Sequence, residues 1–302
     1  MTRFRLGTRG SPLALVQAHM VQAALAAAHG WPPDAIAIVT VKTTGDRVQD
    51  RALAEIGGKA LWTKELDRAL LEGEVDACVH SMKDVETIRP AALAIAAMLP
   101  RADVRDRLIG AESIAALPQG AVIGTSSPRR AAQLGGLRPD LRITLLRGNV
   151  DTRLGKVASG EIDATLLAAA GLERLGRPDV GAAIPIEVML PAPAQGAVGI
   201  ETRAGDPAAE RVAAIGCAET MACVLAERAL LAALSADCHS PVAALAVEEG
   251  GMIHMRAALF SADGREQIAG EARGADGIAT AAALAADLLS RAPPAIAALF
   301  GG

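Results

Sequence analysis

Short apolar runs alternate with amphipathic stretches along the first part of the chain. Three of the runs have the length of buried strands: residues 4–9, 36–41 and 75–79. Residues 61–71 show the apolar spacing of a helix. A second helix is predicted from Ser11 to Gly30, because Ser is a favoured N-cap and Pro12 suits the first helical position. Alternating strands and helices are typical of α/β sheets.

The middle of the chain repeats the pattern of its beginning. Gly124-Thr-Ser-Ser-Pro128 follows an apolar run and opens a helix, as Ser11-Pro12 does. Gly73-Glu-Val-Asp-Ala77 matches Gly160-Glu-Ile-Asp-Ala164, and both segments lead into apolar runs. Two matched segments in the same order predict two topologically similar α/β domains. The alternative is that both matches are ordinary strand, cap and helix sequence without a duplication.

The pattern changes after Gly216. A helix at 220–234 is followed by three short apolar runs separated by glycine turns, and then by a last helix at 278–289. This order predicts a three-stranded antiparallel sheet with helices on one side. Residues 197–201 are predicted to return to the first domain as a strand. The expected domains are an α/β domain of residues 1–99 with 195–216, an α/β domain of residues 100–194 and a smaller α+β domain of residues 217–302.

Composition limits the possible functions. The 302 residues are 51% hydrophobic and 21% charged, which is enough apolar material for several cores. A net charge of −4 argues against nucleic acid as a partner, since nucleic-acid binders usually have a basic balance. The apolar run at 91–99 is too short to span a bilayer, and no apolar secretory signal is visible. We therefore expect a cytoplasmic protein without a membrane partner, and nothing demands more than a monomer.

The cysteines and histidines predict no metal site. The four cysteines lack zinc-ligand spacing, and free thiols are expected in a reducing cytosol. Cys238 differs from the others because its neighbours are polar. His80 and His239 stand alone in the sequence and are expected to be structural.

Candidate chemistry begins at His80-Ser-Met-Lys-Asp84, directly after the apolar run at 75–79. Open α/β sheets present binding and catalytic groups where their strands end, so a site is predicted here. The alternative is an ordinary polar loop.

Cationic residues gather at the predicted strand ends and helix starts. They are Arg9, Lys83, Arg129, Arg130, Arg147, Arg153 and Arg174. Helix starts bind anions, and Arg captures carboxylate or phosphate through two parallel hydrogen bonds. Any one of these residues could be a solvated surface charge. Together they predict a cleft between two domains that binds a small poly-anion, with Asp84 as a carboxylate among the cations.

Several longer motifs carry a family resemblance. They are His80-Ser-Met-Lys-Asp84, Gly124-Thr-Ser-Ser-Pro-Arg-Arg130, Leu146-Arg-Gly-Asn-Val-Asp-Thr-Arg-Leu154, Ala170-Gly-Leu-Glu-Arg-Leu-Gly176 and Gln195-Gly-Ala-Val-Gly-Ile-Glu201. On these motifs the chain resembles the hydroxymethylbilane synthase family, also called porphobilinogen deaminase. The resemblance runs in the right order from Thr8 to the C-terminal domain. The resemblance implies two periplasmic-binding-protein-like domains around a cleft and a third domain that carries a cofactor.

By position, the resemblance implies a dipyrromethane cofactor joined to Cys238 by a thioether. Asp237 stands where family members often have Gly, and Trp62 where they often have Phe. The implied reaction joins four porphobilinogen molecules head to tail with loss of ammonia, and ends in hydrolysis to hydroxymethylbilane, in haem biosynthesis. Loss of the amine gives an azafulvene cation, which the free α-carbon of the growing chain attacks.

Asp84 is the catalytic residue that the resemblance implies, since a carboxylate can hold the pyrrole N–H, stabilise the cation and shuttle protons. Lys83 and the arginines are expected to keep it ionised. The acetate and propionate arms of the substrate account for the surplus of arginines. The implied substrate- and cofactor-binding residues are Arg9, Ser11, Ser81, Lys83, Thr125, Ser126, Ser127, Arg129, Arg130, Arg147, Gly148, Arg153, Arg174 and Gln195.

The competing hypothesis is a non-catalytic cytoplasmic binding module for a small poly-anion. Duplicated domains and an arginine-lined cleft suit it equally well. Asp84 among the cations, and Cys238 in a separate third domain, argue against it.

Overall fold

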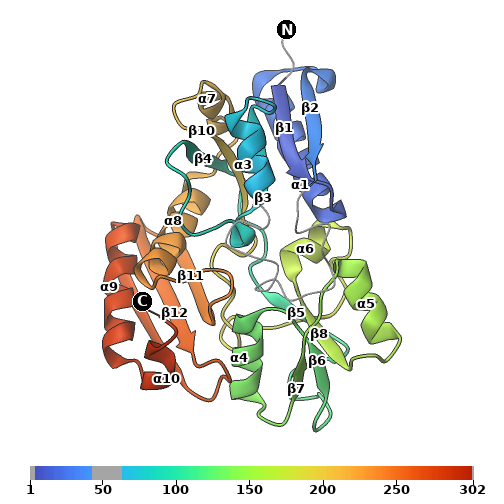
Figure 1. Cartoon of the computed structure of the whole chain (residues 1–302), viewed down its shortest axis with the longest axis vertical. Coiled ribbons are helices and arrows are strands. Elements are labelled where there is room, and N and C mark those ends of the chain that lie inside the picture. The colour runs from blue at the N-terminus through green and yellow to red at the C-terminus, as the bar shows by residue number, and fades with distance from the viewer. Residues whose placement is uncertain (1–3, 43–62, 301–302) are drawn as a thin grey trace. The chain divides into compact units, whose positions relative to one another are not determined.

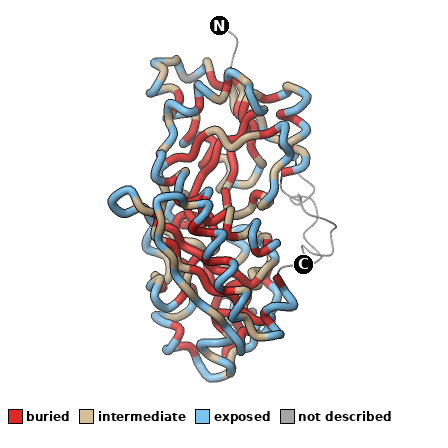
Figure 2. The backbone as a smooth tube through the Cα atoms, turned by 90° about the vertical axis from the view of Figure 1, so that its left-hand side faces the viewer, coloured by how far each residue is buried: buried red, intermediate tan, exposed pale blue. Residues whose placement is uncertain are grey.

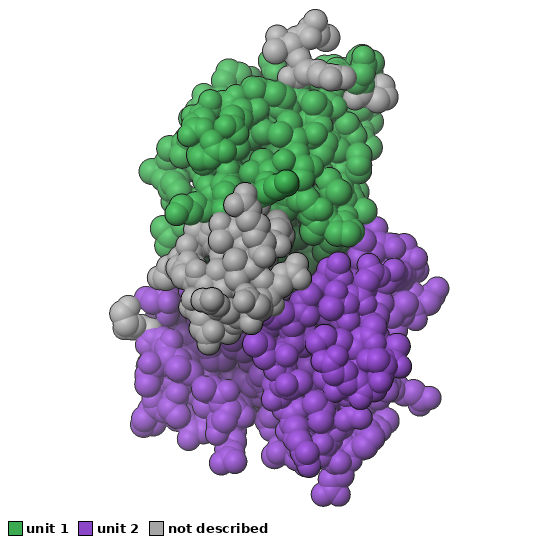
Figure 3. All heavy atoms as spheres, turned by 45° about the vertical axis from the view of Figure 1, so that its right-hand side comes forward, with its two compact units in different colours: residues 1–102, 196–221 green, residues 103–195, 222–302 purple. Residues whose placement is uncertain are grey.

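The computed structural model describes residues 4–42 and 63–300. The chain divides into two compact units: residues 1–102 with 196–221 form unit 1, and residues 103–195 with 222–302 form unit 2. Figure 1 labels the elements, and Figure 3 colours the two units separately. The polar, glycine-containing sequence of residues 42–58 predicts a loop, but apart from Lys42 this segment lies outside the described residues, as does Trp62.

Unit 1 is built on a five-stranded sheet with the order β2-β1-β3-β10-β4. Its elements are β1 (Phe4–Arg9), α1 (Pro12–His29), η1 (Pro33–Ala35), β2 (Ile36–Val41), α3 (Lys64–Leu71), β3 (Ala77–Ser81), β4 (Leu93–Met98), β10 (Val198–Arg203) and α7 (Ala208–Ala213). Strands β1, β2 and β3 are parallel, whereas β10 runs antiparallel to both β3 and β4. The predicted return of residues 197–201 to the first sheet is confirmed.

Helices cover both faces of this sheet. Alternate residues of β3 belong to different cores: Val79 packs with α1 and α7, whereas Cys78 packs with α3. The predicted start of α1 is confirmed, because the Ser11 side chain accepts a hydrogen bond from the backbone of the first turn and Gly30 ends the helix in the left-handed conformation at φ 62°. Figure 2 shows the backbone coloured by burial, with buried stretches inside and exposed stretches at the outside.

Unit 2 contains a second five-stranded sheet, with the order β7-β6-β8-β5-β9. Its elements are β5 (Asp106–Ile109), β6 (Val122–Gly124), α4 (Pro128–Leu137), β7 (Arg142–Thr144), α5 (Val150–Ala158), β8 (Ala164–Ala168), α6 (Ala169–Arg174) and β9 (Ala182–Ala183). The strands β6, β7 and β8 are parallel and β5 is antiparallel, as β1, β2, β3 and β10 are in unit 1. The matched order confirms the prediction of two similar α/β sheets.

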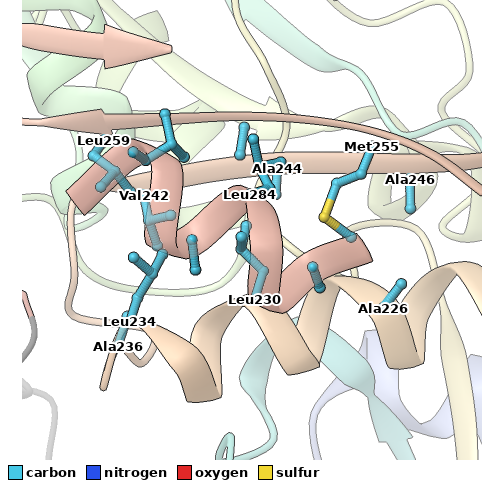
Figure 4. Packing of buried hydrophobic residues seen from close by; sticks show 14 of the residues in the cluster. Ala226, Leu230, Leu234, Ala236, Val242, Ala244, Ala246, Met255, Leu259 and Leu284 are labelled. Atoms are coloured by element: carbon cyan, nitrogen blue, oxygen red, sulfur yellow. The ribbon is translucent and has the colours of Figure 1, made fainter. Parts of the chain in front are cut away.

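The rest of unit 2 forms the predicted three-stranded antiparallel sheet. Its elements are β11 (Val242–Glu249), β12 (Met252–Phe260), β13 (Gln267–Gly274), α8 (Ala218–Ala233), α9 (Gly277–Arg291) and α10 (Pro294–Ala297). The boundary between the two units falls within α8, so only the part from Ala222 belongs to unit 2. Figure 4 shows Leu230 of α8 and Leu284 of α9 in one core with Ala244 and Met255 of the strands. Both five-stranded sheets and this third sheet confirm the predicted fold class. The division into three domains stays a prediction, because residues 103–195 and 222–302 form one compact unit.

Candidate active site

Asp84 lies in a single 3-10 turn, η3 (Met82–Asp84), at the end of β3. The prediction that the strand ends before His80 was wrong, because β3 continues through Ser81, which pairs with Val198 of β10. The strand can continue because its polar side chains find partners inside the unit. Asp84 itself is half-buried, and within the described ranges no residue donates a hydrogen bond to its carboxylate.

Contacts from two other elements fix where this turn begins. The backbone N–H of Met82 donates to the carbonyl of Ala197 at 3.1 Å. A Cβ on Gly199 of β10 would overlap the sulfur of Met82, so glycine is needed there to leave room for the methionine. Gln17 Nε2 of α1 donates to Ser81 Oγ at 2.8 Å, and Ser81 Oγ lies 3.0 Å from Gln17 Oε1, to which it donates in turn. Ser81 therefore has a structural partner, and its predicted role as a ligand contact stays a prediction.

A buried ion network lies next to β3. Arg89 donates from Nε and Nη2 to the two carboxylate oxygens of Glu201, at 2.9 and 2.8 Å. His80 contacts the same carboxylate, with 3.3 Å between Nε2 and Oε2. Burial alone would raise the pKa of Glu201, but the contacts with His80 and Arg89 outweigh burial and hold this pKa at about 2. The network gives His80 a structural role. Arg89 lies in no motif of the sequence, and Glu201 ends a motif that gives no sign of its buried partners.

Two predicted cations share the sheet edge that carries Asp84. Arg9 is the last residue of β1, Lys83 lies in η3, and both are half-buried. Because β1 and β3 are adjacent parallel strands, their carboxyl ends place these two side chains at the same edge as Asp84. Ser11 is the N-cap of α1, and its Oγ accepts a hydrogen bond from the backbone N–H of Ala14 at 3.4 Å.

The equivalent turn of unit 2 runs from Thr125 to Ser127 and is held by its own hydroxyl groups. Thr125 is buried, and its Oγ1 accepts a hydrogen bond from the N–H of Ser127 at 3.1 Å. Ser127 is the N-cap of α4, and its Oγ accepts from the N–H of Arg130 at 3.4 Å. Ser126 lies between them and is half-buried. The two capping hydroxyls thus shape the turn, and their predicted contact with a ligand stays a prediction.

Asp106 of β5 gathers three of the predicted binding residues around one buried carboxylate. Arg129 Nη2 and Arg130 Nη2 each donate to it at 2.7 Å, and Gln195 Nε2 donates at 2.9 Å. Arg129 also donates to the carbonyl of Leu190 at 2.7 Å. These bonds tie α4, β5 and the 190–195 linker together. The sequence contained no signal for this, because Asp106 is separated from its arginines by 23 and 24 positions.

Electrostatics show how strongly this cluster is coupled. Burial alone would raise the pKa of Asp106, but the charges of Arg129 and Arg130 outweigh burial and hold it well below its usual range. Burial lowers the pKa of Arg129, and Asp106 opposes that change. The two arginines and Asp106 leave a surplus of one positive charge. The structure therefore gives both arginines a structural role, while their predicted binding of the cofactor stays a prediction.

The loop after β7 carries three more predicted residues. Gly148 has φ 107°, and a Cβ there would come within 2.6 Å of the Thr152 side chain, so glycine is required. Arg153 Nε donates to the carbonyl of Gly148 at 3.0 Å, and Arg147 is half-buried. Arg174 ends α6, and burial lowers its pKa, with Glu173 opposing.

Cys238 lies in a tight turn after α8 and is exposed, whereas Cys78 and Cys223 are buried. Asp237 Oδ1 accepts a hydrogen bond from the N–H of His239 at 2.8 Å, and the N–H of Asp237 donates to Ser240 Oγ at 3.1 Å. Asp237 therefore stabilises the turn at a position that the family often gives to glycine. An exposed thiol on a braced turn is accessible for a thioether, so the residues present fit the implied attachment.

Among residues 4–42 and 63–300, no three His, Cys, Asp or Glu side chains form a group that could hold a metal ion. None of the helices in these ranges combines the length and the apolar character needed to cross a bilayer.

Comparison with known proteins gives matches over almost the whole chain. Residues 4–211 match the family described as porphobilinogen deaminase, dipyromethane cofactor binding domain, and residues 221–291 match porphobilinogen deaminase, C-terminal domain. The porphobilinogen deaminase of Sphingopyxis alaskensis is 58% identical over 303 aligned positions, covering 98% of this chain and 96% of that protein. That of Paracoccus denitrificans is 52% identical over 296 positions, covering 96% and 94%.

Among solved structures, substrate binding domain 2 of Lactococcus lactis GlnP is similar at a TM-score of 0.43 and 11% identity, over 70% of this chain and 87% of that one.

Proposed function

The chain belongs to the porphobilinogen deaminase family, and from this premise we propose that Asp84 is its catalytic carboxylate and Cys238 the attachment point of its cofactor. The enzyme is a transferase that condenses four porphobilinogen molecules with loss of ammonia on a dipyrromethane primer and releases hydroxymethylbilane for haem biosynthesis. The observation that carries this function is the match of both family domains, in order, to residues 4–211 and 221–291. The comparisons give no support to a non-catalytic binding module.

The surroundings of Asp84 support its proposed role. Asp84 is half-buried, and none of the described residues donates a hydrogen bond to its carboxylate. An anionic oxygen can accept the pyrrole N–H and stabilise the positive charge that develops as the amine leaves. Arg9 and Lys83 at the same sheet edge supply positive charge for the acetate and propionate arms of porphobilinogen.

The basic residues of unit 2 divide into two groups by their contacts. Arg129, Arg130 and Gln195 are bonded to Asp106, and we propose that they set the shape of the turn after β6 while their surplus positive charge attracts carboxylates. Arg147, Arg153 and Arg174 are half-buried, and we propose that they bind the carboxylate arms of the cofactor and of the growing chain. The cleft between the first two domains stays a prediction.

Cys238 would hold the dipyrromethane through its sulfur. When bound, this group supplies the free α-carbon to which the first porphobilinogen is joined. The contribution of the chain is the braced turn, in which Asp237 and Ser240 hold the backbone around the exposed thiol.

Intact mass of Cys238→Ser tests the attachment. Wild-type protein should exceed its sequence mass by the increment of two pyrrole rings, and Cys238→Ser should lack that increment. Cys217→Ser, at a half-buried cysteine, is the control and should retain it. An unchanged increment in Cys238→Ser would place the linkage elsewhere.

Ammonia release from porphobilinogen tests the role of Asp84. Asp84→Asn should fold normally, carry the cofactor and lose about 10²–10⁴ in rate, the usual contribution of an acid–base group. Asp103→Asn, at an aspartate paired with Arg105 outside the site, should keep the wild-type rate. Near-normal turnover in Asp84→Asn would rule out the assignment.

We also propose that the enzyme is a cytoplasmic monomer. The expectations from the sequence and the biosynthetic role of the family support this proposal. Size-exclusion chromatography with light scattering should give the mass of one chain. A dimer mass at micromolar concentration would contradict the monomer.

A further inference from the structure

The segment that follows Asp84 is anchored by one guanidinium. Arg89 lies five positions beyond Asp84, and its side chain is 9% exposed. Arg89 Nη1 donates to Glu86 Oε2 at 2.5 Å, and Thr63 Oγ1 donates to Glu86 Oε1 at 2.6 Å. Glu86 is therefore held from two sides, two positions after Asp84.

The same guanidinium is fixed by two other elements of unit 1. It binds both oxygens of Glu201 in β10, and it also bonds Asp67 in α3. The three carboxylates around Arg89 are 1%, 13% and 17% exposed, so water screens these charges only weakly. Burial is the main cause that raises the pKa of Asp67, and Arg89 opposes it. Because Glu201 binds Arg89 through both of its oxygens, Arg89 stays anchored without Asp67, and Arg89 fixes Glu86.

We propose that Glu86 and Arg89 are positioning residues for the reaction, because they hold the backbone on the C-terminal side of Asp84. Met82 holds the N-terminal side through its contacts with β10. Asp84 acts on the substrate, and Glu86 acts only through Asp84. The inference rests on the proposed catalytic role of Asp84. With one anchor lost, the carboxylate moves relative to the sheet edge, and a displacement of about 1 Å can cost about 10²-fold in rate.

Glu86→Gln is the test variant, and Asp67→Asn is its matched control. Each replaces one carboxylate of the same guanidinium by an amide of the same shape, but Asp67 belongs to α3 and not to the segment of Asp84. The measurements are kcat and KM for ammonia release by the holoenzyme, cofactor loading by intact mass, and Tm by circular dichroism.

We expect similar falls in Tm and full cofactor loading in both variants. In Glu86→Gln alone, kcat should fall about 10- to 100-fold while KM stays within about twofold of the wild-type value. A purely structural role would lower Tm in both variants without separating kcat from KM. Equal kcat values for the two variants would overturn the inference.

Two further variants keep the outcome decisive. If Glu86→Gln does not fold, Thr63→Val removes only the hydroxyl that donates to Glu86, and kcat should fall about 3- to 10-fold. An unchanged kcat in Thr63→Val would then overturn the inference. Asp84→Asn is measured in parallel. If it turns over normally, the proposed role of Asp84 fails and the positioning role falls with it. If it is inactive while Glu86→Gln is fully active, only the positioning role fails.

Discussion

Replacing Asp106 by asparagine removes the carboxylate that two buried arginines share. Arg129 and Arg130 are 3% and 6% exposed, and each donates to Asp106 at 2.7 Å. In Asp106→Asn the side chain keeps its size but loses its charge. Its amide NH2 then faces a guanidinium, which cannot accept a hydrogen bond. Two positive charges then face each other in a buried site, with water largely excluded.

The magnitude follows from the burial of all three groups. Breaking a buried ion pair by removing one partner costs about 3–5 kcal/mol, because the charge left behind is uncompensated. For a unit of the size of unit 2, each kcal/mol lowers the Tm by about 2–4 °C, so the Tm should fall by roughly 6–20 °C. Asp103→Asn is the matched control, three positions away. Asp103 pairs with Arg105 at the surface, where side-chain exposures are 26% and 45%, so its loss should cost well under about 1 kcal/mol.

Thermal and urea unfolding of both variants, followed by circular dichroism at pH 7, give the comparison. The pKa of Asp106 is depressed in the folded protein, so its contribution is fully present above the unfolded pKa of about 3.9 and is lost as the pH falls toward the lower folded pKa. The difference between wild type and Asp106→Asn should therefore be constant from pH 5 to 7 and narrow below about pH 4. A Tm for Asp106→Asn within 2 °C of that for Asp103→Asn would refute the reasoning.

Two further predictions concern the turn that carries Asp84. Gly199→Ala places a methyl group where the sulfur of Met82 lies, so we expect the free energy of unfolding to fall by about 1–3 kcal/mol and ammonia release to be lost. The double variant Gly199→Ala/Met82→Ala should recover activity. A fully active Gly199→Ala variant would contradict the packing argument. Glu201 has a pKa of about 2 in the folded protein, below the value of about 4.3 in an unfolded chain. Its ionised form should therefore add about 3 kcal/mol to the free energy of unfolding above about pH 4.3, and this stabilisation should be lost as the pH falls toward 2. Glu201→Gln should lower the Tm at pH 7. Between pH 4 and pH 2 its Tm should fall less than that of the wild type, and an equal fall in both proteins would contradict that account.

Local signals in the sequence predicted the starts of α1 and α4. Ser11 and Ser127 cap α1 and α4 through hydrogen bonds that reach only three positions along the chain, so their effect is present in the sequence itself. The matched segments likewise predicted two sheets of the same strand order. The three-stranded sheet followed from glycine turns between short apolar runs.

The strands predicted from the sequence were wrong or missing where polar residues are buried. The end of β3 was misplaced because His80 and Ser81 look like loop residues, but Glu201 and Gln17 provide partners for them. Strand β5 was missed because it begins with a charged residue, Asp106. Each of these partners lies 23 or more positions away, and a strand can hold a polar group in its core only when such a partner arrives.

The sequence by itself determined the family and the alternation of strands and helices, and it predicted which residues carry the reaction. Only the tertiary structure decided which charges are already paired. It bonded Arg129 and Arg130 to Asp106, and it joined Arg89 to Glu201 across 112 positions. The physical reason is that an ion pair depends on the distance through space and on exclusion of water, and separation along the chain fixes neither.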